Sequence, residues 1–224
     1  MEEKPRLSRE KIIAAAAGLA DRSGLARVSM RNVGAELGVE AMSLYHYLSN
    51  KEELLDELSD FVFSQIEIPD ESTQWRSALE FRASSTRRVL VAHPWGLGMI
   101  ESRPIPGPAL LKHHNSVLGH LVRAGCEPLF ASQAFATLDA FVYGFVLSET
   151  SMPFEMKEGA EMDYAASLTL DESEYPFLAE NVAALREAGG FAFSDGFQVG
   201  LGIILDSIEA RLEGGGITSP SPLR

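Results

Sequence analysis

Apolar residues recur along this chain at the spacing of an α-helix. Near the N-terminus, Ile12, Ala16, Leu19 and Ala20 fall at i, i+4, i+7 and i+8, which places them on one helical face. Later stretches repeat this periodicity, and no segment alternates apolar and polar residues as a half-buried strand does. The pattern therefore predicts an all-α fold.

Capping residues and helix breakers divide this pattern into separate helices. Ser8 suits a helix start, and a later start is open between two capping-box registers, Ser49 with Glu52 and Asn50 with Glu53. Glycines and prolines mark most of the other boundaries. The predicted helices cover residues 8–23, 29–37, 40–48, 50–66, 75–91, 95–101, 109–124, 128–150, 176–188 and 195–212.

The breaks in the pattern also divide the chain into larger parts. Pro69 and its polar neighbours interrupt the helical pattern, which places a domain boundary near residues 67–72. Residues 151–174 are acidic and irregular, and the last residues are rich in glycine, serine and proline. We expect a domain at 1–66, a larger helical domain at 67–213 and a disordered tail at 214–224.

Two predicted helices are apolar over most of their circumference. The helix at 129–150 and the helix at 195–212 each carry large apolar residues on more than one face. Such a helix must be covered on more than one side. Either it lies in the centre of a monomer, or one side packs the core and another packs a second subunit. Glycines at 144, 200 and 202 would allow close helix approach, and we favour the dimer.

The segment between Val28 and Leu48 has the pattern of a helix-turn-helix. Gly38 suits the sharp turn, and the apolar residues on either side of it would lock the two short helices together. The second helix then presents several side chains outward, where it can enter a DNA major groove. The locking residues are Val33, Leu37, Val39, Leu44 and Leu48; the outward residues are Ala41, Met42, Ser43, Tyr45 and His46.

Charge is distributed unevenly along the 224 residues. Residues 4–51 carry eight bases and four acids, a net charge of +4, whereas residues 52–224 carry eleven bases and twenty-six acids, a net charge of −15. A basic head on an acidic body indicates that the head meets a polyanion. The single Cys126 excludes an internal disulfide, and the clean apolar runs are shorter than a membrane helix needs, so we expect a cytoplasmic protein without membrane contact.

Residues 8–66 resemble the DNA-binding domain of the tetracycline-repressor (TetR) family. The most diagnostic stretch is Leu44–Leu55, in which an aromatic pair is followed by Asn-Lys-Glu-Glu-Leu-Leu. The remainder resembles the family's ligand domain more loosely, through Trp75, the step from Ser102 to Pro104, Gly125 and the segment 208–212. The resemblance implies a three-helix DNA-binding domain at 1–66 and a helical ligand-binding and dimerisation domain at 67–213.

The resemblance also implies which residues contact DNA. Arg31 matches a position that reaches a guanine edge with two hydrogen bonds, and Ala41 and Met42 match positions over the bases. His46 faces either the bases or solvent. Ser29 and Ser43 have the alternative role of caps or turn formers, and Tyr47 that of a core residue. The positions that match phosphate contacts are Ser29, Ser43, Tyr45, Tyr47 and Lys51.

A homodimer and a small-molecule effector are further implications of the resemblance. The two apolar helices at 129–150 and 195–212 would pair between subunits, and the two heads would bind a near-palindromic double-stranded operator. An inducer in the larger domain would release the operator. Residues proposed to line its pocket, each with a core role as the alternative, are Trp95, Met99, His113, His114, Val117, Phe141, Phe145 and Glu149.

No metal or cofactor is expected. His113 and His114 point about 100° apart on a helix, and His113 and His120 lie about 10 Å apart along it, so neither pair can easily share an ion. The tetracycline repressor anchors its drug-bound magnesium through a histidine whose matching position here is Met99. A thioether is a poor ligand for a hard cation, which argues against a magnesium–tetracycline inducer.

Other classes of function have little support in the sequence. We find no Gly-x-Ser-x-Gly, phosphate loop, Glu-x-x-His or His-Glu-x-x-His pattern, so we expect no enzyme. The alternative is a helical ligand-binding or scaffolding dimer without operator binding. The sequence does not reveal the operator, the inducer, the regulated genes, the direction of regulation or whether ligand binding needs a metal, and repression is the expectation by analogy with the family.

Overall fold

The computed structural model describes residues 7–100, 102–103, 105–152, 171–188 and 193–214. Within these ranges every regular element is helical, and turns and short links join the elements. This confirms the predicted all-α class. Residues 153–170 of the predicted irregular segment and residues 215–224 of the predicted tail lie outside the described residues. The chain divides into two compact units, Met1–Val146 and Leu147–Arg224.

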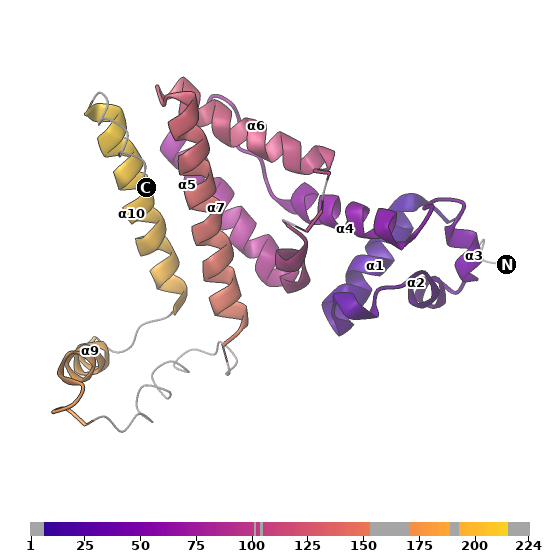
Figure 1. The fold of residues 1–224 in the computed structure, drawn as a ribbon, viewed down its shortest axis with the longest axis horizontal. Helices are drawn as coiled ribbons and strands as arrows, with labels where there is room; N and C mark the ends of the chain where they lie inside the picture. The colour runs from indigo at the N-terminus through magenta and orange to yellow at the C-terminus, as the bar shows by residue number, and fades with distance from the viewer. Residues whose placement is uncertain (1–6, 101, 104, 153–170, 189–192, 215–224) are drawn as a thin grey trace, which may run out of the picture. The chain divides into compact units, whose positions relative to one another are not determined.

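The N-terminal part of the first unit is a small helical head. It contains α1 (Arg9–Ser23), the 3-10 turn η1 (Leu25–Arg27), α2 (Met30–Leu37), α3 (Ala41–Leu44) and α4 (Lys51–Gln65). Figure 1 shows α1, α2 and α3 gathered at the N-terminal end, with α4 leading away from them. They enclose an apolar core that includes the fully buried side chains of Ile12, Val33, Leu44, Leu48, Leu54 and Leu58.

Side-chain caps set the starts of the head helices. Ser8 Oγ accepts a hydrogen bond from the Lys11 amide at 3.3 Å, as predicted for a serine cap. At α4, Asn50 Oδ1 accepts from the Glu53 amide at 2.9 Å, and Glu53 Oε2 accepts from the Ser49 amide at 2.6 Å. The capping box therefore uses the second of the two predicted registers.

Two predicted helices differ from the structure. The helix expected at 40–48 is shorter, because α3 ends at Leu44 and turns follow it. Arg9 Nη1 donates to the Tyr47 carbonyl at 2.9 Å, and this interaction from outside favours the turn over a continued helix. The α-helix expected at 95–101 is instead the 3-10 helix η2 (Pro94–Met99), which contains two glycines and begins at a proline.

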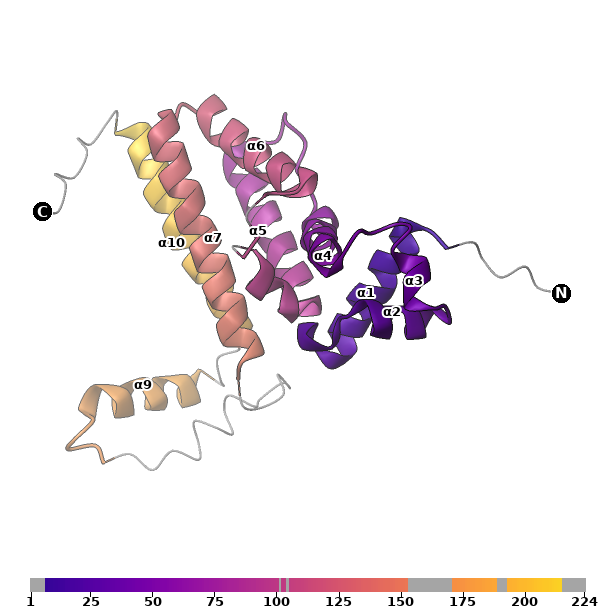
Figure 2. The ribbon, with the colours of Figure 1, turned by 45° about the vertical axis from the view of Figure 1, so that its right-hand side comes forward.

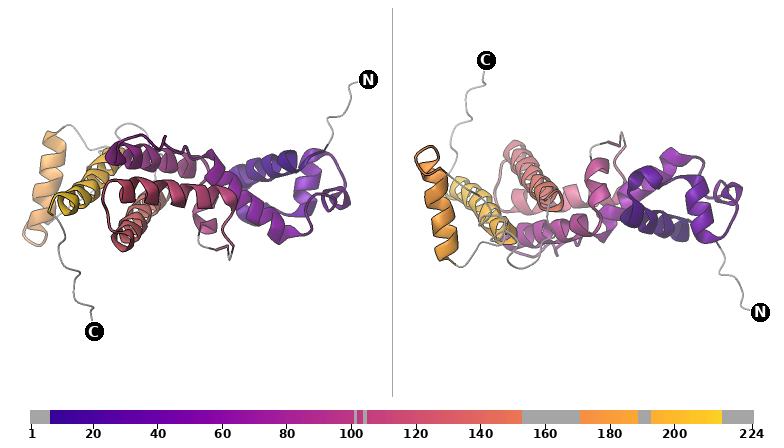
Figure 3. Two further views of the ribbon diagram at one scale, coloured as in Figure 1. Left: turned by 90° about the horizontal axis from the view of Figure 1, so that it is seen from above. Right: turned by 90° about the horizontal axis from the view of Figure 1, so that it is seen from below.

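The rest of the first unit is a helical body. Its elements are α5 (Trp75–Ala92), η2, α6 (Pro108–Arg123) and the part of α7 (Pro128–Thr150) up to Val146. Within the unit, α4 packs against α5, η2 and α6, and α5 packs against α6. In Figures 2 and 3, α3 lies at the end of this unit farthest from α5 and α6. The body therefore supports the head from the side opposite α3.

The second unit contains α9 (Pro176–Glu187) and α10 (Phe193–Glu213). Their bounds agree closely with the helices predicted at 176–188 and 195–212. Along α10 the apolar residues form two stripes. Phe197, Leu201 and Leu205 are buried, whereas Val199 and Ile203 are more than half exposed. This helix is thus apolar on a face that the described chain leaves uncovered.

The helix α7 is long and apolar, as predicted. Among the described helices it alone reaches the length and hydropathy of a membrane span, a property that the core helices of globular proteins share. Its buried positions include Ala134, Leu138 and Val142, and also one carboxylate, Asp139. An acid within such a helix requires a partner, which is described below.

Candidate DNA-binding surface and buried polar cluster

A tight glycine turn fixes α3 against α2. Gly38 has φ of 65°, a left-handed conformation that favours glycine, and its amide donates to the Ala35 carbonyl. The Val39 amide donates to the Gly34 carbonyl at 2.9 Å. A Cβ added at Gly34 would lie 2.9 Å from the Val39 carbonyl oxygen. The two glycines therefore allow a close approach that sets the angle between the two helices.

The short helix α3 and the turn after it expose several of the side chains predicted to face DNA. Leu44 is fully buried in the head core, while Met42 is 72% exposed and Tyr45 44% exposed. His46 is also exposed, and Ala41 and Ser43 are half-buried. The head thus presents a short helical face of small, apolar and aromatic side chains, held by one buried leucine.

Unpaired cations accompany this face. Arg31 in the first turn of α2 and Lys51 in the first turn of α4 are exposed, and within the described residues neither forms an ion pair. Arg22, by contrast, is paired with Glu36 at 2.7 Å. Exposed cations without carboxylate partners are available to phosphates or to guanine edges. The roles predicted for Arg31 and Lys51 require this exposure, and they stay predictions.

Arg9, at the start of α1, binds both α4 and the turn that follows α3. Besides the Tyr47 carbonyl, its guanidinium contacts Glu57 and Glu53, both at 2.6 Å, and these carboxylates raise the pKa of Arg9. The Tyr47 hydroxyl donates to the Leu7 carbonyl at 2.9 Å. The Tyr47 hydroxyl is therefore hydrogen-bonded within the head, which favours the core role given above as the alternative to a phosphate contact. Ser29 likewise caps α2, accepting from the Asn32 amide at 3.2 Å.

Polar contacts connect the head to the body. Asp21 Oδ1 on α1 accepts from Trp95 Nε1 at 2.6 Å and lies 2.7 Å from His93 Nδ1. On the α4 side, Asp60 Oδ1 accepts from the Ala109 amide at 2.8 Å. Arg103 adds ion pairs to Asp56 at 2.6 Å and to Glu52 at 3.0 Å. Movement of η2 or α6 would thus be transmitted to both sides of the head.

Two residues predicted to line the ligand pocket belong to this junction instead of to the interior of the body. Met99 is buried in the apolar cluster of the head, and Trp95 packs against the same cluster. Val117 is buried on α6, and Phe141 and Phe145 form a tilted ring pair on α7 with centroids 5.8 Å apart. Glu149 lies in the second unit. The structure thus distributes the predicted pocket residues over several places.

A buried ion pair lies in the body between α5 and α7. The Arg82 side chain is 1% exposed, and its two terminal nitrogens contact the two carboxylate oxygens of Asp139, the longer contact being 3.2 Å. Tyr143 donates its hydroxyl hydrogen to Asp139 Oδ2 at 2.9 Å. The guanidinium also lies over the Phe135 ring, 5.4 Å from its centroid. We call Arg82, Asp139, Tyr143, His113 and His114 the buried polar cluster.

The electrostatics of this cluster favour a charged pair among neutral neighbours. Burial alone would lower the pKa of Arg82, but Asp139 more than offsets it and keeps the arginine charged. Burial and the Asp139 carboxylate raise the pKa of Tyr143, which stays protonated. Burial, followed by the Arg82 charge, lowers the pKa of His113. Burial is also the main cause of the lowered pKa of His114, which packs edge-on against Phe135 at 4.8 Å.

Arg82, Asp139 and Tyr143 are not among the site residues predicted from sequence. A signal was present, because Asp139 is the single charged residue between Pro128 and Ser148 in an otherwise apolar helix. A carboxylate in such a helix marks a buried partner of opposite charge. Sequence alone does not say which of the many arginines supplies it.

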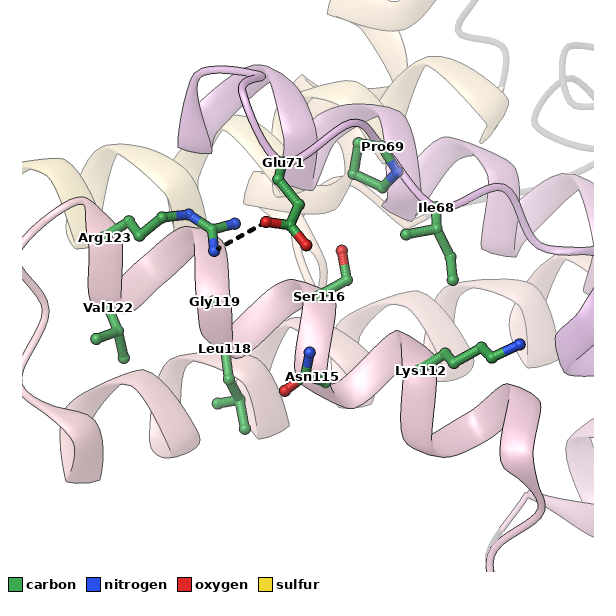
Figure 4. Close-up of a pocket in the computed structure, with 10 residues that line it drawn as sticks. All are labelled: Ile68, Pro69, Glu71, Lys112, Asn115, Ser116, Leu118, Gly119, Val122 and Arg123. Atoms are coloured by element: carbon green, nitrogen blue, oxygen red, sulfur yellow. Dashed lines mark ion pairs between the residues drawn. The ribbon is translucent and has the colours of Figure 1, made fainter.

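A separate groove of about 480 Å³ lies on the surface of the body (Figure 4). The segment after α4 forms one wall and α6 the other, and Figure 4 shows Glu71 and Arg123 facing each other across it. Their charged atoms are 3.9 Å apart. None of the residues predicted to bind an effector lines this open groove, whose lining mixes apolar residues such as Leu118 with charged ones.

A short exposed helix, held by a glycine turn against a second helix at one end of an all-α unit, defines a helix-turn-helix protein. Residues 12–58 match the family model of bacterial regulatory proteins of the tetR family, and residues 68–212 match that of tetracyclin repressor-like C-terminal domains. The chain belongs to the TetR family of transcriptional regulators and is a transcription factor, not an enzyme.

Known proteins resemble the chain over most of its length. An HTH-type transcriptional regulator of Saccharopolyspora erythraea is 35% identical over 182 residues, which cover 81% of this chain and 77% of that protein. The HTH-type transcriptional repressor DrrR1 of Streptomyces coeruleorubidus is 35% identical over 216 residues, covering 92% and 78%. The structure of the Streptomyces coelicolor TetR family protein ActR in complex with (S)-DNPA has a TM-score of 0.71 at 26% identity, covering 95% and 100%.

Proposed function

We propose that this protein is a homodimeric repressor that binds a near-palindromic operator and is released from it by a small molecule. Residues 1–66 are the DNA-binding domain and residues 67–213 the ligand-binding and dimerisation domain in this proposal. The observation that carries it is the α3 face, fixed by the Gly34 and Gly38 turn and accompanied by unpaired Arg31 and Lys51.

The exposed apolar face of α10 supports the dimer. Val199 and Ile203 are 63% and 62% exposed on a helix whose opposite stripe is fully buried. On α7, Leu129 and Leu147 are also more than half exposed. Such side chains on a helix indicate a partner surface. Replacing Val199 and Ile203 with glutamate should convert the dimer into a monomer in sedimentation equilibrium, whereas glutamate at the exposed loop residue Ile105 should not.

The junction between head and body supports release by an effector. An effector that favours one arrangement of η2 and α6 would shift the head through the Asp21, Asp60 and Arg103 contacts. Among the relatives, DrrR1 is named a repressor, and ActR was solved with the small molecule (S)-DNPA. These names support repression and a small-molecule effector for this chain, acting in the cytoplasm where operator DNA is found.

Selection of bound duplexes from a random DNA pool tests the proposal. The pure full chain is used at two salt concentrations, because binding through phosphates weakens steeply with salt. The expected result is an enriched near-palindrome with half-sites about 34–36 Å apart, one helical turn. Lys112→Ala is a matched control, since it removes one exposed positive charge outside the head and should leave the enriched sequence unchanged.

The alternative function is a ligand-binding or scaffolding dimer without operator binding. Absence of any enriched sequence at both salt concentrations would contradict operator reading and leave this alternative. An enriched sequence whose affinity is insensitive to salt would contradict the role assigned to Lys51 and the other cations.

A further inference from the structure

The residues that follow α3 form an exposed turn beyond the end of the helix. α3 ends at Leu44, and Tyr45 and His46 are exposed in the turn, whereas Leu44 and Leu48 on either side are buried. Exposed backbone outside a helix moves easily unless other groups bind it. The orientation of Tyr45 and His46, both among the predicted DNA contacts, therefore depends on contacts made from other parts of the head.

Those contacts come from the starts of α1 and α4. Arg9 Nη1 donates to the Tyr47 carbonyl at 2.9 Å, and the Tyr47 hydroxyl donates to the Leu7 carbonyl at 2.9 Å. Glu53 Oε2 accepts from the Ser49 amide at 2.6 Å. The turn is thus bound at its last residue and again two residues later, and Arg9 and Glu53 themselves form an ion pair.

Arg9 is a poor candidate for a phosphate contact. Its Nη2 donates to Glu57 and Glu53, each at 2.6 Å, and these two carboxylates raise the pKa of Arg9. The Ser49 amide, followed by Arg9, lowers the pKa of Glu53, which stays ionised. Two carboxylates around one guanidinium leave a net negative charge, which repels a phosphate. Arg31 and Lys51, by contrast, form no ion pair within the described residues.

We propose that Arg9 is a positioning residue for operator reading, which fixes the turn at 45–47 without contacting DNA itself. Glu53 and Glu57 hold the guanidinium, and the Tyr47 hydroxyl adds a second link between the turn and the start of α1. Arg9 is then a base of the head that acts through another segment of the chain. The inference deepens the proposed operator binding and rests on it.

The dependence of affinity on salt separates positioning from a phosphate contact. The full chain and Arg9→Gln are compared on the selected operator by fluorescence anisotropy. Loss of a hydrogen bond to a charged group reduces the population of the competent turn, so affinity should fall about tenfold. The slope of log affinity against log salt should stay the same, because no phosphate contact is lost. Lys51→Ala is the reference, since it should make the slope shallower.

Arg22→Gln is the matched control for Arg9→Gln. Arg22 is a second arginine of α1 and pairs with Glu36 on α2 at 2.7 Å, so its replacement also removes an ion pair within the head. It leaves the contacts of the turn intact. The affinity of Arg22→Gln should therefore stay within about twofold of that of the unaltered chain.

A double-mutant cycle shows whether Arg9 acts through the turn. Replacing Tyr45 and His46 together with alanine removes both exposed side chains of the turn. This change should cost much less affinity in the Arg9→Gln chain than in the unaltered chain, because a displaced turn has already lost its contacts. Arg31→Ala should cost the same factor in both chains, since Arg31 lies on α2. Partial unfolding of the head would scale down the affinity of every variant alike and would give no such selectivity.

Two milder variants keep the test decisive should Arg9→Gln fail to fold. Arg9→Lys keeps a positive charge beside Glu53 and Glu57, but a single ammonium lacks the planar fork that reaches the carbonyl and both carboxylates. Tyr47→Phe removes only the hydroxyl bond to Leu7. Both should retain the fold by circular dichroism and show the same weakened effect of the Tyr45 and His46 replacement.

Several outcomes would overturn the inference. These are a shallower salt slope for Arg9→Gln, an affinity equal to that of Arg22→Gln, an additive cycle between Arg9 and the turn, or no loss when Tyr45 and His46 are replaced in the unaltered chain. An additive cycle on a selected operator refutes the inference alone. Absence of any enriched duplex with the unaltered chain refutes the proposed operator binding, and the inference with it.

Discussion

The head and the body of the first unit have opposite kinds of interior. Among the described residues, all the buried polar or charged side chains belong to the body: Arg82, Ser85, Thr86, His113, His120 and Asp139. The buried side chains of the head are entirely apolar, and its ion pairs, such as Arg9 with Glu53, lie at the surface. One chain thus contains an apolar interior in the head and, in the body, an interior with buried polar atoms, of which Arg82 Nε and His113 Nδ1 have no hydrogen-bond partner among the described residues.

This difference corresponds to two tasks. A helix that enters a DNA groove must keep a fixed orientation, and an apolar core of well-packed side chains provides this. A site that recognises a small molecule must place polar groups in the interior, where each unsatisfied group costs stability.

Removing one member of the buried ion pair should have the largest effect on stability. Asp139→Leu leaves the Arg82 charge buried without its partner, so the free energy of unfolding should fall by about 3–5 kcal/mol. The double variant Arg82→Met with Asp139→Leu should lose much less. Urea unfolding measures both. Glu36→Ala is the control in the head, where the exposed pair with Arg22 is worth at most about 1 kcal/mol. Equal losses of unfolding free energy in Asp139→Leu and Glu36→Ala would contradict the difference between the interiors of the body and the head.

A methyl group at Gly34 should disturb the head through its backbone. Gly34→Ala places a Cβ 2.9 Å from the Val39 carbonyl oxygen, and such overpacking costs about 1–3 kcal/mol. Operator affinity should fall as α3 shifts. Gly18→Ala is the matched change in α1, where the nearest atom is the flexible end of Arg22 at 3.3 Å. Gly18→Ala should leave the free energy of unfolding unchanged or raise it slightly. Similar shifts in melting temperature for Gly34→Ala and Gly18→Ala would contradict the role of the close approach at Gly34.

Replacing Arg31 and replacing Lys51 should change DNA binding in different ways. Arg31→Ala should relax specificity at one base pair, by about 1–3 kcal/mol of discrimination. Lys51→Ala should weaken all sequences alike and make the dependence of affinity on salt shallower. Electrophoretic mobility shifts with the selected operator and its single-base variants measure both effects. A uniform loss for Arg31→Ala would show that this residue contacts only phosphate.

The smallest effect concerns the pH dependence of stability. The pKa of His113 in the folded chain lies below its usual 6.5, so near pH 6 the unfolded chain binds more protons and stability falls as the pH is lowered. His113→Phe should reduce this loss by under about 1 kcal/mol at pH 6. Val117→Ala is the control, because it destabilises α6 without removing a titrating group. An unchanged pH slope in His113→Phe would show that the histidine titrates normally.

The head could be predicted from sequence in considerable detail because its signals are local. Ser8, Ser29 and Gly38 specify helix ends within a few residues of themselves, and the structure confirms all three. The exception is α3, which ends at Leu44, and the turn that follows it is bound by Arg9 through the Tyr47 carbonyl, 38 positions away in sequence. Local pattern contains no information on such a contact.

The buried polar cluster could not be assembled from sequence for the same reason. Arg82 and Asp139 are 57 positions apart, and nothing in the helical periodicity pairs them. His113 was predicted as a pocket residue from its place on α6, yet its protonation follows from the Phe63 carbonyl on another helix. The prediction of His113 and the other effector contacts remains to be tested.

The hydrogen bond between Trp95 and Asp21 has an optical consequence. The chain has only two tryptophans, Trp75 and Trp95. Trp95 donates its indole hydrogen to a carboxylate of the head, and its ring lies 5.7 Å from His93. Its emission is therefore sensitive to the separation of α1 from η2, while Trp75 at the start of α5 supplies a background. With Trp75→Phe, the protein reports the position of its own head by intrinsic fluorescence, without any attached dye.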